Sequence, residues 1–402
     1  MMVKSKEASR ARRVICVGDT SEWNLMNHKN RLKLQSSKIG LLSDNRTIGF
    51  MSHNVLGLDR ETSEVLGWLY IELFNRPIDN VPYTRDNGSV PIEDKESFKW
   101  LKTSQISKEI SLEHSKHALF ITDRESDIYE YLCSIPDDKT DILLRAKHNR
   151  YVLNEKGKKV KVFEDIENRD KLGSTTFEIK DNRKRISRKA KLDIKSAKYK
   201  IQRPSKKWLR DKYPEEIEMT MVYAKEINAP NGEEPVKWYL WTTERVDELE
   251  QSIEKIKLYT LRWKVEEAHR LLKSEGFNLE DSELENPESI RKWLLMGMEA
   301  SIKIQQLKEA REGNTSVEVR EVFEEDEMKC LEYLNGVYEG ATEKQRNPYQ
   351  KDSLAWASWI IARIGGWKGY TSQRKPGTIT YKWGYEKFQT LMIGFRLNKP
   401  PS

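Results

Sequence analysis

The chain has 402 residues, of which 34% are charged, and its formal net charge is +7 at pH 7. This length exceeds what one hydrophobic core usually supports, so we expect two or more domains, and the positive charge favours a polyanionic partner. No apolar run is long enough for a membrane span, and residues 1–13 are too basic for an export signal. Cys16, Cys133 and Cys330 are scattered without metal-ligand spacing, which favours reduced thiols over a zinc site.

Two apolar runs each end in an aspartate. Residues 13–19 end in Asp19, and residues 118–123 end in Asp123. Each run predicts a buried strand with a carboxylate at its carboxyl end, where open α/β sheets place their ligands. One such aspartate alone is more often a helix cap or a turn residue, but the chain has two.

The other elements in this half of the chain complete a recognisable order. Three early strands are followed by a helix, a strand, a helix and a strand, as in a ribonuclease-H-like mixed sheet. In that order the Asp19 and Asp123 strands are parallel and adjacent at the centre of the sheet. The helix at residues 93–116 is expected to bury Phe98, Leu101, Ile106 and Ile110. The remaining predicted elements are strands at residues 48–58, 65–74 and 141–146 and a helix at residues 126–134.

Residues 147–246 have a different pattern, with short alternating runs separated by turn residues, which predicts an antiparallel β insertion. Within it, residues 183–210 are rich in Lys and Arg and contain one acid, Asp193. This segment is either a solvated basic hairpin or a surface that follows a phosphate backbone. At the end of the preceding strand lie three further candidates for phosphate contact, namely Arg145, Lys147 and Arg150.

One long helix, at about residues 247–275, carries the most informative spacing. Its polar residues follow the pattern Y-x2-R-x3-E-x6-K, so steps of three, four and seven place them on one helical face beside an apolar stripe. On its own this row also fits a solvated charged face. Together with Asp19 and Asp123, its glutamate gives three carboxylates, a set suited to two divalent metal ions. The four residues are Tyr259, Arg262, Glu266 and Lys273; Asp247 and Gly276 are the expected N-cap and stop.

Beyond residue 285 the pattern is helical, with helices predicted at residues 287–312, 317–334, 352–364 and 381–395. The sequence thus divides into a catalytic domain at residues 1–285 and an all-α C-terminal domain at residues 286–402. A small pair of terminal helices cannot bury many large aromatic side chains alone, so the preceding helices or a partner subunit must cover them. These aromatic residues are Trp356, Trp359, Trp367, Trp383 and Phe388.

These motifs together resemble the bacterial cut-and-paste DDE transposases of the insertion-sequence-four type, particularly the transposon-five transposase. The likeness rests on Gly18-Asp19-Thr20, the segment from Asp123 to Tyr129, the Tyr259-to-Lys273 signature and the C-terminal aromatic tail. It covers nearly the whole chain, although residues 151–226 are only loosely similar. The resemblance implies a transposase that cleaves transposon ends and transfers the strands into target DNA.

The resemblance also implies roles for individual residues. Asp19, Asp123 and Glu266 would bind two Mg²⁺ ions, with Mn²⁺ as an expected substitute. Tyr259, Arg262 and Lys273 would contact DNA phosphates, and Arg270 is a weaker candidate. Trp238 would stack on a base flipped out of the duplex, although a core aromatic is the alternative. His269 is expected to be a packing or DNA-contact residue, and Trp241 a plain core residue.

The expected partners are double-stranded DNA and a second copy of the chain in a synaptic homodimer, in the cytoplasm and associated with the nucleoid. One departure from the family concerns the start of the chain. Family members carry a DNA-binding domain before the first catalytic strand, whereas Asp19 here follows Met1 by only eighteen residues. A catalytically silent, truncated transposase that dimerises with the full-length enzyme and inhibits it is therefore the alternative function.

Overall fold

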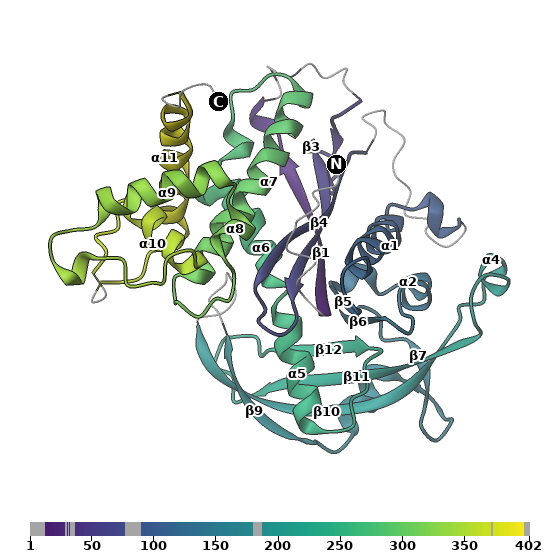
Figure 1. Ribbon diagram of the computed structural model, residues 1–402. Helices are drawn as coiled ribbons and strands as arrows, with labels where there is room; N and C mark the ends of the chain where they lie inside the picture. Colours follow the sequence, from purple (N-terminus) through teal and green to yellow (C-terminus); the bar gives the residue numbers. More distant parts are fainter. Residues whose placement is uncertain are drawn as a thin grey trace.

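The computed structural model describes residues 13–397, except residues 29, 31, 33–36, 77–89, 180–186, 371–372 and the side chains of residues 274 and 275. The described part is a mixed α/β structure whose strands join in one mixed sheet (Figure 1). The strand order is β2-β3-β1-β5-β6-β12-β11-β10-β7-β8, with β4 beside β3 and β9 beside β10. The strands are β1 (Arg13–Asn24), β2 (Gly40–Leu41), β3 (Ile48–Asp59), β4 (Val65–Phe74), β5 (His117–Thr122), β6 (Thr140–Arg145), β7 (Tyr151–Asn154), β8 (Lys159–Lys161), β9 (Gly173–Ile179), β10 (Arg188–Gln202), β11 (Glu216–Ile227) and β12 (Lys237–Thr242).

At the centre of the sheet, β1 pairs with β3 on one side, antiparallel, and with β5 on the other, parallel. The predicted adjacency of the Asp19 and Asp123 strands is therefore confirmed. Val17 pairs with Ile121, and continuing this register by two residues brings Asp19 level with Asp123. Side chains two residues apart point to the same face of a sheet, so both aspartates share the face of Val17 and Ile121.

The strands predicted in the β insertion are present and antiparallel. They do not form a separate sheet, because β12 pairs with β6 and so extends the central sheet directly. Of the predicted basic segment, residues 183–186 lie outside the described residues. The insertion is thus held at a fixed position relative to the strand that follows Asp123.

Helices cover the two faces of the sheet differently. On one face lie α1 (Phe98–Leu112) and α2 (Tyr129–Ser134), and on the other lie α5 (Leu249–Thr260), α6 (Trp263–Arg270) and α7 (Pro287–Ala310) (Figure 1). The insertion also carries the short helices α3 (Val162–Asn168) and α4 (Lys207–Arg210).

The buried side of α1 differs from the prediction. Leu101 is buried, but Phe98, Ile106 and Ile110 are only partly buried, and serines take the inner positions. Small side chains let the helix approach the strands closely, as in the 3.3 Å contact between Ser111 Oγ and Cys16 Sγ. Several of these hydroxyls donate to carbonyls of their own helix, which satisfies them without an outside partner.

The prediction of a single long helix at residues 247–275 is wrong. The chain forms α5, turns at Leu261 and Arg262 through bonds to carbonyls three residues back, and continues as α6. It then widens into a π turn at Leu271–Glu275 before Gly276. The N-cap is Glu248 rather than Asp247, because Glu248 and Gln251 form a reciprocal capping box.

The C-terminal segment is helical as predicted, with α8 (Val319–Val322), α9 (Glu325–Tyr338), α10 (Leu354–Ile364) and α11 (Thr378–Leu397). The helix predicted at residues 317–334 is divided at Phe323 and Glu324. Trp356, Trp359 and Phe388 are buried within this segment, whereas the Trp383 side chain is 53% exposed. The preceding helices therefore cover most of the aromatic residues, and α11 keeps an exposed apolar side.

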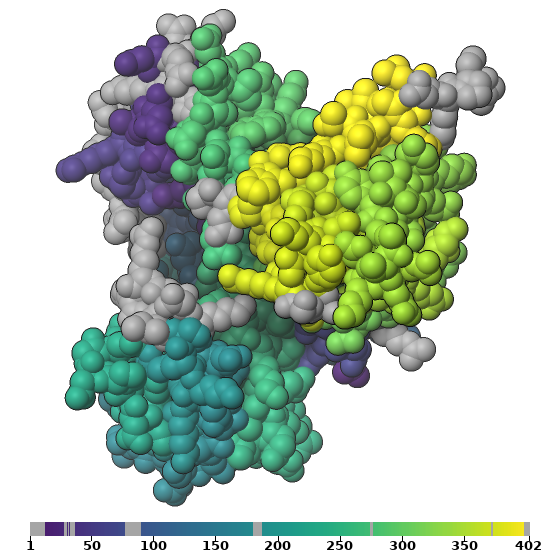
Figure 2. Space-filling model, turned by 90° about the vertical axis from the view of Figure 1, so that its left-hand side faces the viewer, coloured from purple at the N-terminus to yellow at the C-terminus, as the bar shows by residue number. Residues whose placement is uncertain are grey.

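Residues of both hydrophobic cores lie on α7, which begins just after the boundary predicted at residue 286. Leu294 and Met298 belong to the sheet core, whereas Ile304 and Leu307 belong to the C-terminal core. Figure 2 shows the yellow-green C-terminal segment packed beside the green region that contains α7. None of the helices in the described part of the chain is both long and apolar enough to cross a membrane.

The contact between α10 and α11 gives a stability prediction. A Cβ atom at Gly384 would lie 2.0 Å from the carbonyl oxygen of Ile361, so Gly384→Ala must push the two helices apart. We expect a loss of about 3 kcal/mol in the free energy of unfolding, at the upper end of overpacking effects. Gly336→Ala on α9 is the matched control, because nothing lies within 4 Å of its Cβ position. It should stabilise the protein by about 0.5–1 kcal/mol. Urea unfolding of both variants checks this, and equal effects would contradict the close approach.

Candidate active site

Asp19 lies on β1 and Asp123 directly follows β5, so neighbouring strands deliver both carboxylates to one place. The two strands are apolar up to these positions because both of their faces are covered by helices. Asp123 has extended backbone geometry, with φ −86° and ψ 179°, and a short turn begins after it. The strand-end placement is therefore observed for Asp123 but is wrong for Asp19, because β1 continues to Asn24 and Asp19 lies within it.

Glu266 comes to the same place from α6, and Arg262 links it to Asp19. The Arg262 guanidinium lies 2.5 Å from Glu266 Oε1 through Nη2, and 3.7 Å from Asp19 Oδ2 through Nη1. The i,i+4 spacing of Arg262 and Glu266 survives the helix break because the turn at Leu261 and Arg262 keeps nearly helical geometry. One cation therefore lies between two of the three predicted carboxylates.

At Asp19, the effect of burial on the carboxylate is larger than the attraction of Arg262. Burial raises the pKa of Asp19 from 3.8 to about 7, and the neighbouring carboxylates Glu266 and Asp123 add to the rise. Arg262 lowers the pKa but does not overcome the burial. Ionisation of the Asp19 carboxylate is thus less favourable in the folded protein than in water, chiefly because the group is buried.

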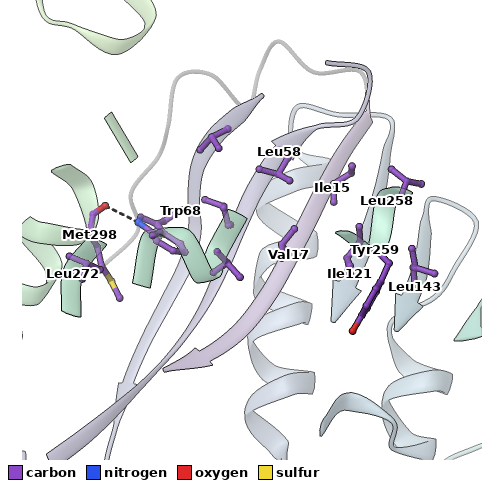
Figure 3. Packing of buried hydrophobic residues seen from close by; sticks show 14 of the residues in the cluster. Ile15, Val17, Leu58, Trp68, Ile121, Leu143, Leu258, Tyr259, Leu272 and Met298 are labelled. Carbon is purple, nitrogen blue, oxygen red and sulfur yellow. Dashed lines mark hydrogen bonds between the residues drawn. The ribbon is translucent and has the colours of Figure 1, made fainter. Parts of the chain in front are cut away.

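Tyr259, at the end of α5, forms the wall beside Asp123. Its ring packs in the core, and its hydroxyl lies beyond the carboxyl ends of the strands that carry Ile121 and Leu143 (Figure 3). Burial raises the pKa of Tyr259 to about 12, with Arg262 opposing the rise and Asp123 adding to it. The hydroxyl is therefore a neutral hydrogen-bonding group at neutral pH.

A cavity of about 800 Å³ opens beside Tyr259, Arg262 and Glu266. Trp238 lies in its wall, edge-on to Tyr259 with ring centroids 6.3 Å apart and to Phe177 with centroids 5.8 Å apart. Trp238 is only partly buried, whereas Trp241 is fully buried, so the prediction that Trp241 is a core residue is confirmed. The predicted site residues that line the cavity are Arg145, Trp238, Tyr259, Arg262, Glu266 and Arg270.

Five predicted site residues lie outside the cavity lining, namely Asp19, Asp123, Lys147, Arg150 and Lys273. Asp19 lies beside the cavity, where it approaches Arg262. Lys273 follows α6 in the π turn, and its ammonium lies 5.4 Å from the centroid of Trp23 and 4.0 Å from Glu280. Arg150 forms an ion pair with the buried carboxylate of Asp127, and the backbone N–H of Lys147 donates to the same carboxylate at 2.8 Å. Lys273 thus lies in the segment after α6, and Lys147 and Arg150 lie in the loop after β6.

The structure also adds cavity residues that sequence reasoning missed. Lys308 and Glu309 come from α7, where Lys308 lies 3.4 Å from Glu267 and Glu309 pairs with Lys264. No spacing in the sequence could have shown these contacts, because α7 packs across the site from a distant part of the chain. They close the cavity on the side opposite the insertion.

The residues present fit a divalent metal ion by their donor chemistry. Within the described residues, no three His, Cys, Asp or Glu side chains lie close enough to hold one ion. Nevertheless, three carboxylates converge, and Asp123 and Glu266 both raise the pKa of Asp19. Carboxylate oxygens are the ligands that Mg²⁺ and Mn²⁺ prefer, and Arg262 occupies the position between two of them.

The raised pKa of Asp19 predicts a pH-dependent stability. A carboxylate with a raised pKa destabilises the folded state as pH rises from about 4 to about 7, because ionisation is easier after unfolding. Asp19→Asn cannot ionise, so in metal-free buffer it should raise Tm by several degrees at pH 8 and leave Tm nearly unchanged at pH 4. Thermal melts across this range check it. Glu250→Gln is the control, because Glu250 is exposed on α5 and its replacement should give no comparable difference in Tm between pH 4 and pH 8.

Comparison with known families agrees with this geometry. Residues 99–300, half of the chain, match the family model described as the transposase DDE domain. The matched stretch begins in α1 and ends in α7, so it contains Asp123 and Glu266, while Asp19 precedes it. The chain therefore belongs to the DDE transposase family.

Proposed function

We propose that this transposase cleaves DNA at the ends of a mobile element and joins the freed ends to target DNA by a cut-and-paste reaction. The observation that carries the proposal is the approach of Asp123, Glu266 and Arg262 to Asp19, with Glu266 and Arg262 also lining the cavity. The strand order β4-β3-β1-β5-β6 supports a ribonuclease-H-like catalytic fold. The Tyr259-to-Lys273 spacing supports the insertion-sequence-four type.

Asp19, Asp123 and Glu266 would hold the divalent ions, Mg²⁺ or Mn²⁺. When bound, these ions supply Lewis acidity to the attacking and leaving oxygens of an in-line displacement at phosphorus. The protein's own contribution is to fix the three carboxylates on a strand, a strand end and a helix. Each carboxylate is held by a packed strand or helix, so the protein fixes their relative positions before DNA binds.

The cations of the cavity would bind the DNA backbone. Arg262 and Tyr259 lie beside the carboxylates, where they reach the phosphate next to the scissile bond. Arg145 and Arg270 extend the basic wall along the cavity. Lys147, Arg150 and Lys273, which lie outside the cavity lining, remain candidates for contacts with more distant phosphates.

Trp238 would receive a base displaced from the duplex. Its ring is partly buried and borders the cavity, so one side is supported by protein while another faces open space. A flipped base loses its stacking partners, and an aromatic face replaces part of that energy. The cavity volume of about 800 Å³ lies within the range of small-molecule sites.

The active form is proposed to be a synaptic homodimer. The supporting observation is the exposed apolar side of α11, where the exposed fractions are 53% for Trp383, 63% for Ile393 and 80% for Leu397. Apolar side chains gathered in this way are typical of surfaces that a partner covers.

The first test is Glu266→Gln, which removes one carboxylate charge and keeps the side-chain shape. We expect cleavage of an end-containing DNA duplex to fall by at least about a thousandfold, while DNA affinity and Tm change little. The checks are gel-based cleavage with Mg²⁺, a filter-binding titration and a thermal melt. Glu250→Gln, an exposed residue of α5, is the control and should cleave normally. Cleavage by Glu266→Gln at the normal rate would refute the assignment.

A second test exploits the position of Arg262 between the carboxylates. Arg262→Met keeps the stem and removes the cation, so Mn²⁺ affinity without DNA should rise several-fold while affinity for DNA falls. Isothermal titration with each partner measures the two changes. Lys264→Met is the matched control, because it removes a cavity cation that pairs with Glu309 instead. An equal rise in Mn²⁺ affinity in both variants would show only a general effect of charge.

A further inference from the structure

A chain of buried polar side chains reaches Asp19 from within the protein. Trp23 Nε1 donates to Ser52 Oγ at 2.9 Å, and Asn54 Nδ2 also donates to Ser52 Oγ, at 3.0 Å. Asn54 Nδ2 lies 2.8 Å from His269 Nε2, and His269 Nδ1 lies 3.9 Å from Asp19 Oδ2. Hydrogen bonds thus join two strands of the sheet to His269 on α6, and the His269 ring lies next to the Asp19 carboxylate without a direct hydrogen bond.

The sheet register dictates this meeting. Asp19 on β1 pairs directly with Asn54 on β3, so both side chains point to the same face. That face packs against α6, where His269 lies one turn after Glu266. His269 is therefore the helix side chain placed to contact the paired Asp19 and Asn54.

The hydrogen bonds fix which nitrogen of His269 carries the proton. The two hydrogens of Asn54 Nδ2 are directed to Ser52 Oγ and His269 Nε2, so Nε2 accepts. With Nε2 accepting from the amide, the neutral ring carries its single proton on Nδ1. The N–H therefore faces Asp19 Oδ2.

Aromatic neighbours hold the orientation of the ring. Trp68 stacks on His269 with an interplanar angle of 13° and ring centroids 6.2 Å apart, and Trp23 meets it edge-on at 6.3 Å. Trp68 is itself fixed, because its indole N–H donates to the carbonyl of Met298 at 3.0 Å (Figure 3). The ring cannot turn without disturbing three elements of the core.

Burying these polar side chains costs free energy that packing alone would not require. His269 and Asn54 are buried among apolar residues, and Asn54 Oδ1 has no hydrogen-bond partner within the described residues. Apolar side chains of similar volume would fill the space without the desolvation of these polar groups. Their common direction toward Asp19 supplies a reason for their presence.

We propose that His269, held by Asn54, is a positioning residue that orients the Asp19 carboxylate for divalent-metal binding. Both His269 and Arg262 approach Oδ2, so neither contact uses the other carboxylate oxygen, Oδ1. Partners of this kind, which hold a ligand rather than the ion, commonly set metal affinity. This inference rests on the proposed function, since it takes Asp19 as a metal ligand.

The first experiment tests the contact without any metal. Selective ¹⁵N labelling of the six histidines of the full chain gives the tautomer of each ring by NMR. We expect the His269 proton on Nδ1, and we expect the ¹⁵N chemical shift of Nδ1 to change clearly in the Asp19→Asn variant. A proton on Nε2, or a His269 chemical shift that is the same in both proteins, would overturn the proposal.

The second experiment separates positioning from packing by Mn²⁺ titration and thermal melts of two variants. His269→Phe keeps an aromatic ring against Trp68 but loses both nitrogens, so Mn²⁺ affinity should fall by about tenfold or more. His269→Asn loses the stacking but can place an amide N–H toward Asp19, so it should recover most of the affinity while its Tm stays low.

His53→Phe is the matched control, because His53 is also buried but lies on β3, where it faces Trp100 and its Nδ1 is 2.8 Å from Thr20 Oγ1. Its Mn²⁺ affinity should stay close to that of the wild type whatever its Tm. If His269→Phe and His53→Phe lower Tm alike and keep normal Mn²⁺ affinity, His269 is a packing residue and the proposal is wrong. Failure of Asp19→Ala to weaken Mn²⁺ binding would instead overturn the metal assignment in the proposed function.

Discussion

The burial of the Asp19 carboxylate between β1 and α6 is the constraint on which the site depends. Covalent geometry and strand pairing place Asp19 beside Asp123, and the packed helix prevents water from solvating it fully. Arg262 offers partial compensation, but its shorter contact is with Glu266 rather than Asp19. Desolvation therefore outweighs attraction, and the folded protein holds a carboxylate whose ionised form is unfavourable. A site in this condition gains from a cation that offsets its negative charge, and perturbed carboxylates of this kind are common in catalytic sites.

Two departures from regular structure shape the space around that carboxylate. The turn between α5 and α6 keeps nearly helical geometry, so Tyr259 forms part of the cavity wall while Glu266, on the same side, reaches Arg262. The pairing of β12 with β6 makes the insertion a continuation of the central sheet, which brings Trp238 to the wall beside Tyr259. Because both residues lie in regular elements, the cavity does not depend on a loop for its shape.

Sequence reasoning succeeded where the signal was local. The apolar runs before Asp19 and Asp123 specify buried strands, and the R-x3-E spacing alone places Arg262 beside Glu266. It failed where tertiary packing decided the outcome. No proline or glycine marks the turn at Leu261, so periodicity predicted an unbroken helix and placed Lys273 with the others. The pairing of Asn54 with Asp19 and the contacts of Lys308 likewise depend on strand register and on a helix distant in sequence, which no local pattern encodes.

The position of α7 connects the cavity with the C-terminal helices. Its first half packs on the sheet through Leu294 and Met298, while its second half packs against α10 and α11 through Leu307. Near the C-terminal end of α7, Lys308 and Glu309 form ion pairs with residues of α6, the helix that carries Glu266. A force on the exposed side of α11 therefore reaches the cavity wall through packed helices and two ion pairs rather than through a flexible linker. In the proposed homodimer, the surface that holds the two copies together and the carboxylates that cut DNA would thus be parts of one mechanically continuous unit.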